Sequence, residues 1–238
     1  MAPPSRSFEA FGTSHLAALA VTVAIVALMG WAARTGQSRA LRMSESTLGW
    51  ILLSMPMVTA TAVAMTGPFD LQSGLPLHYC DMATIAGGIA LLFRRPLAIE
   101  IVYFFGLAGT LQGLLTPALQ LDFPHPRYFH FFVIHGGVVI AALHLVWNRG
   151  FHPRPWAIAR MLVATVVYSI LAGVLNWLLQ TNFGFLCAKP PNASLMDHLG
   201  PWPWYVGSLL ALSAVFYTVL DLPFWKERSL AWNTSHKV

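Results

Sequence analysis

The stretch YFHFFVIHGGVVIAALHLVW, residues 128–147, decides the fold because it runs for 20 residues without an Asp, Glu, Lys or Arg. Bilayer hydrocarbon is about 30 Å thick, and a helix that rises about 1.5 Å per residue crosses it with roughly 20 apolar residues. At that depth the backbone must satisfy its own hydrogen bonds, as a helix or in a closed barrel. The run is too long and too continuous for a barrel strand, so it is predicted to be a transmembrane helix.

The composition extends this prediction to the whole chain. Of the 238 residues, 56% are hydrophobic and only 10% are charged, whereas soluble domains average about 25% charged residues. We predict an all-α fold: a single polytopic bundle over residues 1–238, with seven transmembrane helices. These helices are expected at about residues 13–33, 47–66, 77–93, 96–115, 128–147, 156–180 and 204–225.

The basic residues lie in alternate connections between the predicted helices. Eleven of the 14 lysines and arginines belong to one side. They are Arg34, Arg39, Arg42, Arg94, Arg95, Arg149, Arg154, Arg160, Lys226, Arg228 and Lys237. Because basic loops stay on the cytoplasmic side, we expect the C-terminus in the cytoplasm and the N-terminus outside. The net charge of +5 is thus a topology signal, and we expect no nucleic-acid partner.

Polar residues gather at the opposite, extracytoplasmic ends of these helices. Polar groups at membrane depth usually face the bundle interior or a cavity, so an outer pocket is one interpretation. The supporting residues expected in it are His15, His78, Asp81, Gln112, Asn176 and Asn182. Hydrogen bonds that join helices are the other interpretation.

The densest polar segment is LPLHYCD, residues 75–81. Pro76 suits the first turn of a helix, which puts Cys80 about one turn inside, where the helix N-terminus favours a thiolate. His135 is expected about two turns below the same boundary on another helix. A cysteine with a histidine base is the smallest nucleophilic pair for acyl transfer, so Cys80 and His135 are the candidate catalytic residues.

Alternatives to this pair remain open. Cys80 and Cys187 are the two cysteines, and both map to the side where disulfides form, so a Cys80–Cys187 bridge or an inert buried thiol is also consistent with the sequence. His135 alone is equally consistent with a hydrogen-bonded core residue. The histidines lack the close spacing of a metal site, and glycine-rich phosphate loops are absent. We therefore expect no metal and no cofactor.

Small and acidic residues inside the helices have structural interpretations. Gly109 and Gly113 form a G-x-x-x-G pair, which lets another helix backbone approach. Glu100 and Asp221 lie about one turn from the cytoplasmic boundary. Intramembrane carboxylates are candidates for function, but at this depth we interpret them as reaching water or pairing with Arg94 or Arg95.

Long motifs in this chain resemble the YwaF-type integral membrane proteins of bacteria. They are FEAFGTSHLAAL, LPLHYCD, YFFGLAGTLQGLLTP, FPHPRYFHFFVIHG and TNFGFLCAKPPNASLMDHLGPWPWY. That family is grouped with the eukaryotic transmembrane protein 164 family of cysteine-centred acyltransferases, which remodel ether phospholipids, and its implied fold is likened to androgen-induced-gene-type lipid hydrolases. The resemblance implies a bacterial cytoplasmic membrane protein whose Cys80 and His135 match the family's Cys and His.

The function expected from these observations is lipid modification, by acyl transfer or by hydrolysis of a lipid ester, in an outer-leaflet pocket. Membrane lipids are then the partners, and nothing in the sequence defines an oligomeric state. Asn176, Gln112 or Asn182 is expected to donate to the oxyanion. Two alternatives stand beside this hypothesis: a small-molecule transporter, and a non-catalytic protein that binds a lipid or another ligand.

Overall fold

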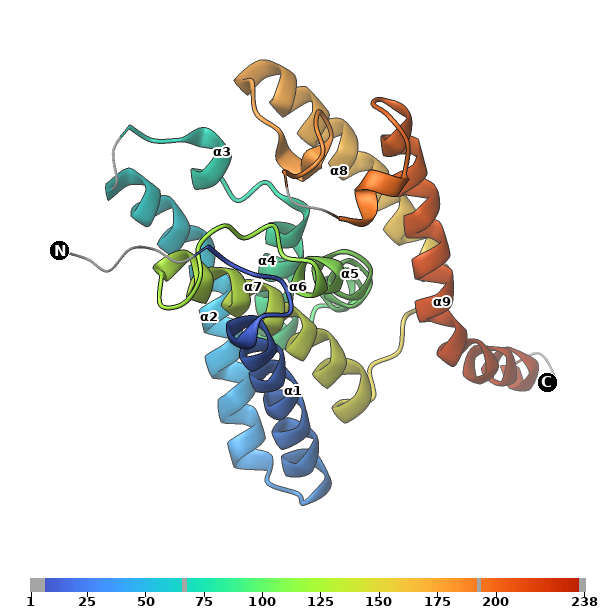
Figure 1. Cartoon of the computed structure of the whole chain (residues 1–238). Coiled ribbons are helices and arrows are strands. Elements are labelled where there is room, and N and C mark those ends of the chain that lie inside the picture. The colour runs from blue at the N-terminus through green and yellow to red at the C-terminus, as the bar shows by residue number, and fades with distance from the viewer. Residues whose placement is uncertain (1–6, 66–67, 192–193, 236–238) are drawn as a thin grey trace.

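The computed structural model of this chain describes residues 7–65, 68–191 and 194–235 and is helical almost throughout (Figure 1). Within these ranges, extended pairing is limited to a single bridge between Ser7 and Leu121. The helical elements are α1 (Thr13–Arg34), α2 (Ser38–Met65), α3 (Leu71–Gly74), α4 (Tyr79–Phe93), α5 (Pro96–Phe105), η1 (Gly106–Thr110), α6 (Leu111–Leu115), α7 (Pro126–Leu143), η2 (His144–Asn148), α8 (Ala157–Leu179), η3 (Phe183–Phe185), η4 (Leu195–His198) and α9 (Trp204–Ser235).

Seven helical stretches of the described chain are long and apolar enough to cross a membrane. Three of them join several elements: α3 with α4, α5 with η1 and α6, and α7 with η2. The η1 and η2 segments are π-helical turns inside otherwise α-helical spans. The seven-helix, all-α prediction is therefore confirmed, while the orientation of the termini stays a prediction.

Three helix boundaries differ from the predicted ones. The second helix begins at Ser38 rather than near residue 47, and the last helix extends to Ser235 rather than ending near 225. The helix that carries Cys80 begins at Tyr79, after the separate short helix α3. Hydropathy marks only the part of a helix that lies in hydrocarbon. Polar residues of good helix propensity continue both long helices beyond it.

Three spans form the centre of the bundle. Buried residues make up 56% and 67% of the most apolar stretches of Pro96–Leu115 and Pro126–Asn148, against 11% in α2 and 17% in each of α1, α8 and α9. The third central span contains α4, which packs on α2, α5 and α7. The outward side chains of α8 include exposed Val167, Ile170 and Val174, which suits a surface covered by lipid tails.

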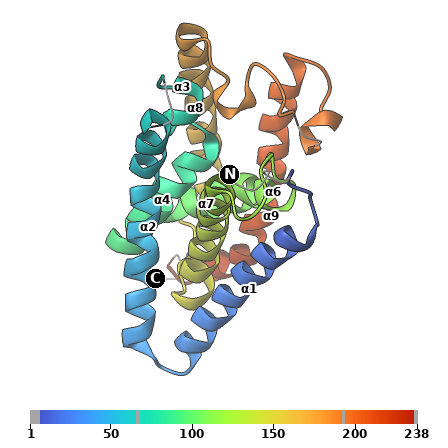
Figure 2. The ribbon, with the colours of Figure 1, turned by 60° about the vertical axis from the view of Figure 1, so that its left-hand side comes forward.

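Small residues bring the central helices close to α2. A Cβ on Gly88 of α4 would lie 2.5 Å from Leu53 Cγ, and one on Gly137 of α7 would lie 2.9 Å from Leu52 Cδ2. Glycine at these positions lets α2 lie against both central helices. By contrast, α8 and α9 pack mainly on each other, as a hairpin beside this body (Figure 2).

Two buried carboxylates join the helices at the arginine-rich end of the bundle. Glu45 accepts hydrogen bonds from Arg94 Nη2 at 2.6 Å and from Arg149 Nε at 2.5 Å. This bonding to Glu45 raises the pKa of Arg149. His144 Nε2 lies 2.6 Å from Glu45 Oε1. Glu45 lies before the predicted start of the second helix near residue 47, so this cluster was not predicted from the sequence.

The second carboxylate is Glu100, which binds Arg154 and Arg160. Arg154 Nη2 donates to Glu100 Oε2 at 2.9 Å, and Arg160 Nη2 donates to Glu100 Oε1 at 2.8 Å. The expectation that Glu100 reaches water or pairs with Arg94 or Arg95 is therefore wrong. Arg94 ends α4 in a left-handed conformation and binds Glu45 of α2 instead. The structural interpretation of Glu100 fits these contacts.

Candidate functional site

A cavity of about 750 Å³ lies between the central body and the α8–α9 hairpin. Its walls come from α2, α4, η1, α6, α7, α8 and α9, together with the loops at one end of the bundle. Cys80 lies at the start of α4, and Arg94 ends the same helix. The cavity therefore lies at the end of the bundle opposite the two arginine clusters.

Cys80 lines this cavity from the first turn of α4. The helix begins after His78, whose backbone N–H donates to the Asp81 carboxylate at 2.8 Å. Asp81 thus caps the N-terminus of the helix, and such a cap stabilises the first turn. The Thr84 hydroxyl donates to the Cys80 carbonyl at 2.8 Å. These contacts hold the backbone of Cys80 at the cavity wall.

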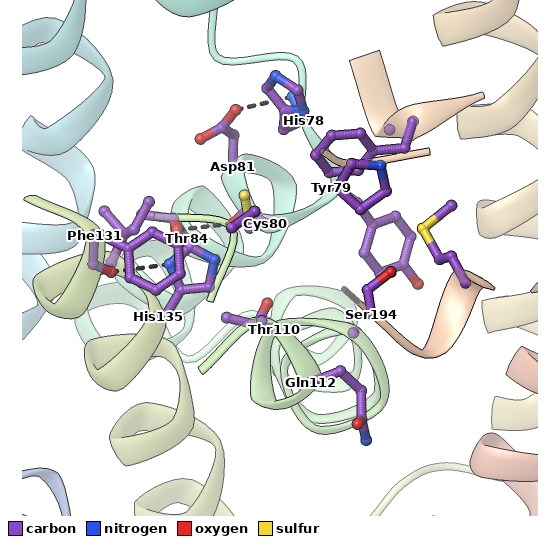
Figure 3. Close-up of a pocket in the computed structure, with 18 of the residues that line it drawn as sticks. His78, Tyr79, Cys80, Asp81, Thr84, Thr110, Gln112, Phe131, His135 and Ser194 are labelled. Carbon is purple, nitrogen blue, oxygen red and sulfur yellow. Dashed lines mark hydrogen bonds between the residues drawn. The ribbon is translucent and has the colours of Figure 1, made fainter. Parts of the chain in front are cut away.

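His135 lines the cavity from α7 and is only 7% exposed. Its Nδ1 lies 2.9 Å from the Phe131 carbonyl oxygen. A carbonyl oxygen accepts and never donates, so Nδ1 carries the proton and Nε2 carries the lone pair. The hydrogen bond that the described residues make to this ring is at Nδ1, and Nε2 is not part of it. Figure 3 shows His135 and Cys80 bordering the same part of the cavity.

Two neighbours fix the plane of the His135 ring. On one side it stacks on Phe131, with ring centroids 4.0 Å apart and planes inclined by 18°. Gly113 of α6 is the second neighbour, because a Cβ there would lie 3.0 Å from His135 Cδ2 and 3.1 Å from Nε2. The G-x-x-x-G pair therefore accommodates side chains rather than another helix backbone, since Gly109 meets the Tyr79 ring in the same way.

His78 and Asp81 also line the cavity, nearer its loops. The Gln72 side-chain amide donates to His78 Nε2 at 3.0 Å, and the Gln72 carbonyl oxygen accepts the Asn182 backbone N–H at 2.5 Å. Gln72 therefore ties α3 and His78 to the loop that follows α8. Gln112 lines the cavity from α6, but Figure 3 shows its side-chain amide pointing away from Cys80 and His135.

The other expected supporting residues are not among the residues that line the cavity. His15 is fully buried, with Nε2 2.9 Å from the Leu114 carbonyl oxygen. The Asn176 amide donates to the Phe183 carbonyl oxygen at 3.0 Å, and its oxygen accepts the Phe183 N–H at 2.6 Å. Asn182 Oδ1 accepts the Cys187 backbone N–H at 2.9 Å. His15 therefore joins α1 to α6, and the two asparagines hold the segment after α8 in place.

Both cysteines are free thiols in this structure. Cys80 is half-buried at the cavity wall, and Cys187 is exposed in the loop that Asn182 organises. This arrangement contains no Cys80–Cys187 disulfide. Within the residues that the structure describes, no three His, Cys, Asp or Glu side chains are grouped closely enough to hold a metal ion.

Two further parts of the cavity wall were not expected from the sequence. A chain of hydroxyl groups joins three helices: Tyr79 OH lies 2.5 Å from Tyr217 OH, which lies 2.8 Å from Thr165 Oγ1. Thr110 lines the cavity from η1 and is 2% exposed. The polarity of Thr110 at membrane depth could have indicated its role, but Gln112 was the polar residue of this span that the sequence singled out.

Seven candidate spans around a Cys- and His-lined cavity define this chain as a polytopic helical membrane protein with an internal site. It belongs to the TMEM164 family, whose model matches residues 10–220. No curated protein sequence and no solved structure matches the chain. All residues that line the cavity, from Met55 to Phe216, fall within the matched region.

Proposed function

We propose that this protein transfers or hydrolyses acyl groups of membrane lipids through Cys80 and His135, in the cytoplasmic membrane of a bacterium. One observation carries the proposal: both side chains line a single cavity, and the hydrogen bond from His135 Nδ1 to the Phe131 carbonyl leaves the Nε2 lone pair available as a base. The YwaF-type resemblance, which assigns the same two residues to the family's Cys and His, supports it independently.

The chemistry proceeds in two halves. His135 Nε2 takes the proton from the Cys80 thiol, and the sulfur attacks the carbonyl carbon of a lipid ester. The bond from that carbon to the alcohol oxygen breaks, and the leaving oxygen takes the proton from His135, which leaves a thioester on Cys80. A second lipid hydroxyl, or water, then attacks the thioester carbon and gives its proton to His135. The Cys80 sulfur leaves and recovers that proton.

The cavity wall supports an amphipathic substrate with a hydrocarbon chain. Leu209, Leu212 and Phe216 line it from α9, while His78 and Asp81 line it near the loops. An acyl chain is stabilised against the apolar wall, because apolar pockets with a few placed polar groups favour such ligands. With basic connections in the cytoplasm, this cavity opens at the level of the outer leaflet.

Packing beneath the cavity favours an enzyme over a transporter. Val138, Ala141 and Leu145 follow His135 along the same span and are completely buried in the main hydrophobic core. A transported polar solute needs a polar route across the membrane. The central helices instead present apolar side chains between the cavity and the arginine clusters.

The test uses the full-length protein in vesicles of phosphatidylethanolamine and phosphatidylglycerol. We expect wild type to release lysophospholipid and to carry a hydroxylamine-sensitive acyl group that mass spectrometry locates on Cys80. Cys80→Ala should lose both signals, and His135→Ala should slow acyl transfer about 10²–10⁴-fold, because a positioned base contributes that much.

Cys187→Ser is the matched control, because Cys187 is the other free thiol and is exposed outside the cavity. It should keep the wild-type rate and the acyl group. Lysophospholipid release that persists in Cys80→Ala would exclude the mechanism. Lipid binding without turnover by wild type, across vesicles of several compositions, would identify a non-catalytic binding protein instead.

A further inference from the structure

Thr110 differs from the other buried threonines on the helices of this protein. The hydroxyl groups of Thr22, Thr84 and Thr165 each donate to the carbonyl oxygen four residues earlier, at 2.8–2.9 Å. Thr110 Oγ1 is buried and has no hydrogen-bond partner in the described part of the chain. A buried hydroxyl without a partner is unfavourable, and such exceptions in folded proteins call for an explanation.

The π-helical turn explains why Thr110 lacks the usual partner. In η1 the Leu111 N–H donates to the Gly106 carbonyl, five residues earlier. That carbonyl lies four residues before Thr110 and is the one that a threonine in a regular α-helix binds. The wider turn shifts the backbone register at this point and leaves the hydroxyl unpaired. Single π-helical turns of this kind occur frequently at functional sites.

The side chain of Thr110 is oriented toward the cavity. Thr110 lines the cavity that Cys80 and His135 also line. Figure 3 shows its oxygen atom pointing toward the space that these two side chains border. Gly113, one turn further along the same span, contacts the His135 ring. The hydroxyl therefore lies on the helix face that meets the base.

The amide side chains that were expected to stabilise an oxyanion have other positions. Asn176 bonds to Phe183, and Asn182 bonds to the backbone of Cys187 and Ala188. The Gln112 amide points away from the pair (Figure 3). Thr110 and Ser194 both line the cavity with a buried hydroxyl that has no partner in the described chain. Ser194 lies in the segment between α8 and α9, whereas Thr110 lies on the span that meets the His135 ring.

We propose that the Thr110 hydroxyl donates a hydrogen bond to the carbonyl oxygen of the acyl group during attack by Cys80. This inference rests on the proposed acyl transfer and adds an oxyanion donor to it. When the carbon–sulfur bond forms, the carbonyl π electrons move onto the oxygen, and Thr110 stabilises that negative charge while keeping its own proton. When the carbon–oxygen bond to the leaving alcohol breaks, His135 supplies the proton to that alcohol.

Two reactions of Cys80 distinguish Thr110 as an oxyanion donor from Thr110 as a residue that only supports the fold. Acylation by p-nitrophenyl laurate passes through an oxyanion, whereas alkylation by iodoacetamide displaces iodide and forms none. A Cys187→Ser background removes the other thiol. Release of p-nitrophenol and intact-protein mass measure acylation, and intact-protein mass also measures alkylation.

We expect Thr110→Val to slow acylation about 100–1,000-fold, as loss of one oxyanion donor does elsewhere, with the alkylation rate unchanged. Thr110→Ser retains a hydroxyl and should lose far less. Thr218→Val is the matched control: its exposed hydroxyl bonds to Ala214 on α9 and does not line the cavity. It should leave both rates unchanged.

Each other outcome overturns the inference. Equal acylation of Thr110→Val and wild type would exclude an oxyanion role while leaving the proposed function intact. Equal slowing of acylation and alkylation, in Thr110→Val and in Thr110→Ala, would show that Thr110 supports the fold instead. If wild type forms no acyl group on Cys80 with the laurate ester or with phospholipid, the proposed function and this inference both fail.

Discussion

Two π-helical turns of this protein hold polar side chains in opposite ways. In η2, both ring nitrogens of His144 are bonded: Nε2 lies 2.6 Å from Glu45 Oε1 and Nδ1 lies 3.0 Å from Asn148 Nδ2. In η1, the buried hydroxyl of Thr110 has no partner within the described chain. Paired buried groups hold helices together, and unpaired ones remain available to a ligand. The arginine-rich end therefore pairs its buried carboxylates, whereas the cavity end leaves a buried hydroxyl unpaired, where we propose the chemistry takes place.

The largest effect that the comparison predicts is on the cavity side. His135→Ala should lower the rate of Cys80 acylation about 10²–10⁴-fold, because it removes the base. The unfolding temperature in detergent should change little, since the hydrogen bond of the ring within the described chain is to a carbonyl of its own helix. A large fall in unfolding temperature with normal acylation per folded molecule would reverse the assignment of His135.

Substitutions at the arginine-rich end should lower the free energy of unfolding. Glu45→Gln leaves Arg94 and Arg149 without their carboxylate. Breaking a buried pair costs about 3–5 kcal/mol, and we expect about 3 because the two arginine side chains are partly exposed. For a chain of this size that corresponds to an unfolding temperature lower by about 6–12 °C.

Glu9→Gln is the matched control for this substitution, because Glu9 is an exposed residue near the start of α1. It should leave the unfolding temperature unchanged within error. An equally small shift in Glu45→Gln would mean that the ion cluster contributes nothing to stability. Loss of acylation with unchanged stability in Glu45→Gln would show that the ion cluster affects the reaction. That result would contradict the separate roles of the two ends of the bundle.

Gly113→Ala tests whether the position of His135 matters. The added Cβ would lie 3.0 Å from His135 Cδ2, so the ring must move. The shift required is a few tenths of an ångström. Because displacement of about 1 Å at a reacting group costs up to about 100-fold in rate, we expect a smaller fall in the rate of Cys80 acylation. Gly173→Ala on α8 meets no atom within 4 Å and is the control. Equal rates in both variants would mean that the ring tolerates displacement.

The smallest predicted effect concerns the link between the hairpin and the body. Tyr217→Phe removes the hydroxyl that lies between Tyr79 OH and Thr165 Oγ1. The net contribution of a hydrogen bond to the free energy of unfolding is about 1 kcal/mol, so we expect the unfolding temperature to fall by about 2–4 °C. Thermal unfolding followed by tryptophan fluorescence measures this change in unfolding temperature. An unchanged unfolding temperature would show that the Tyr217 hydroxyl adds nothing to the stability of the contact between the hairpin and the body.

Much of the fold was predictable because membrane-spanning helices can be identified from local composition. Apolar runs near 20 residues predicted seven spans, and the structure has seven. Helix ends were less predictable. The segment from Ser38 to the predicted start near residue 47 is largely polar, so hydropathy placed these roughly two and a half turns, with Glu45, outside the helix. The ion cluster around Glu45 was missed for that reason.

The candidate site was predicted in part. Cys80, His135, His78, Asp81 and Gln112 line one cavity, and the helix ends already suggested that they share one side of the membrane. His15, Asn176 and Asn182 were expected at the same end of the bundle, but His15 bonds to the backbone of α6 and the two asparagines bond to the backbone that follows α8. Depth follows from the position of a residue along its span, whereas its direction depends on how that helix is rotated against its neighbours.

The sequence alone determined the seven helices of the described chain that are long and apolar enough to span a membrane, because each apolar run must be helical in hydrocarbon whatever surrounds it. Only the tertiary structure decided which polar groups are paired and which face the cavity. That depends on helix rotation, on the register shift at Gly106–Thr110 and on contacts such as Gly113 with His135. These are relations between segments distant in sequence, and local composition does not encode them.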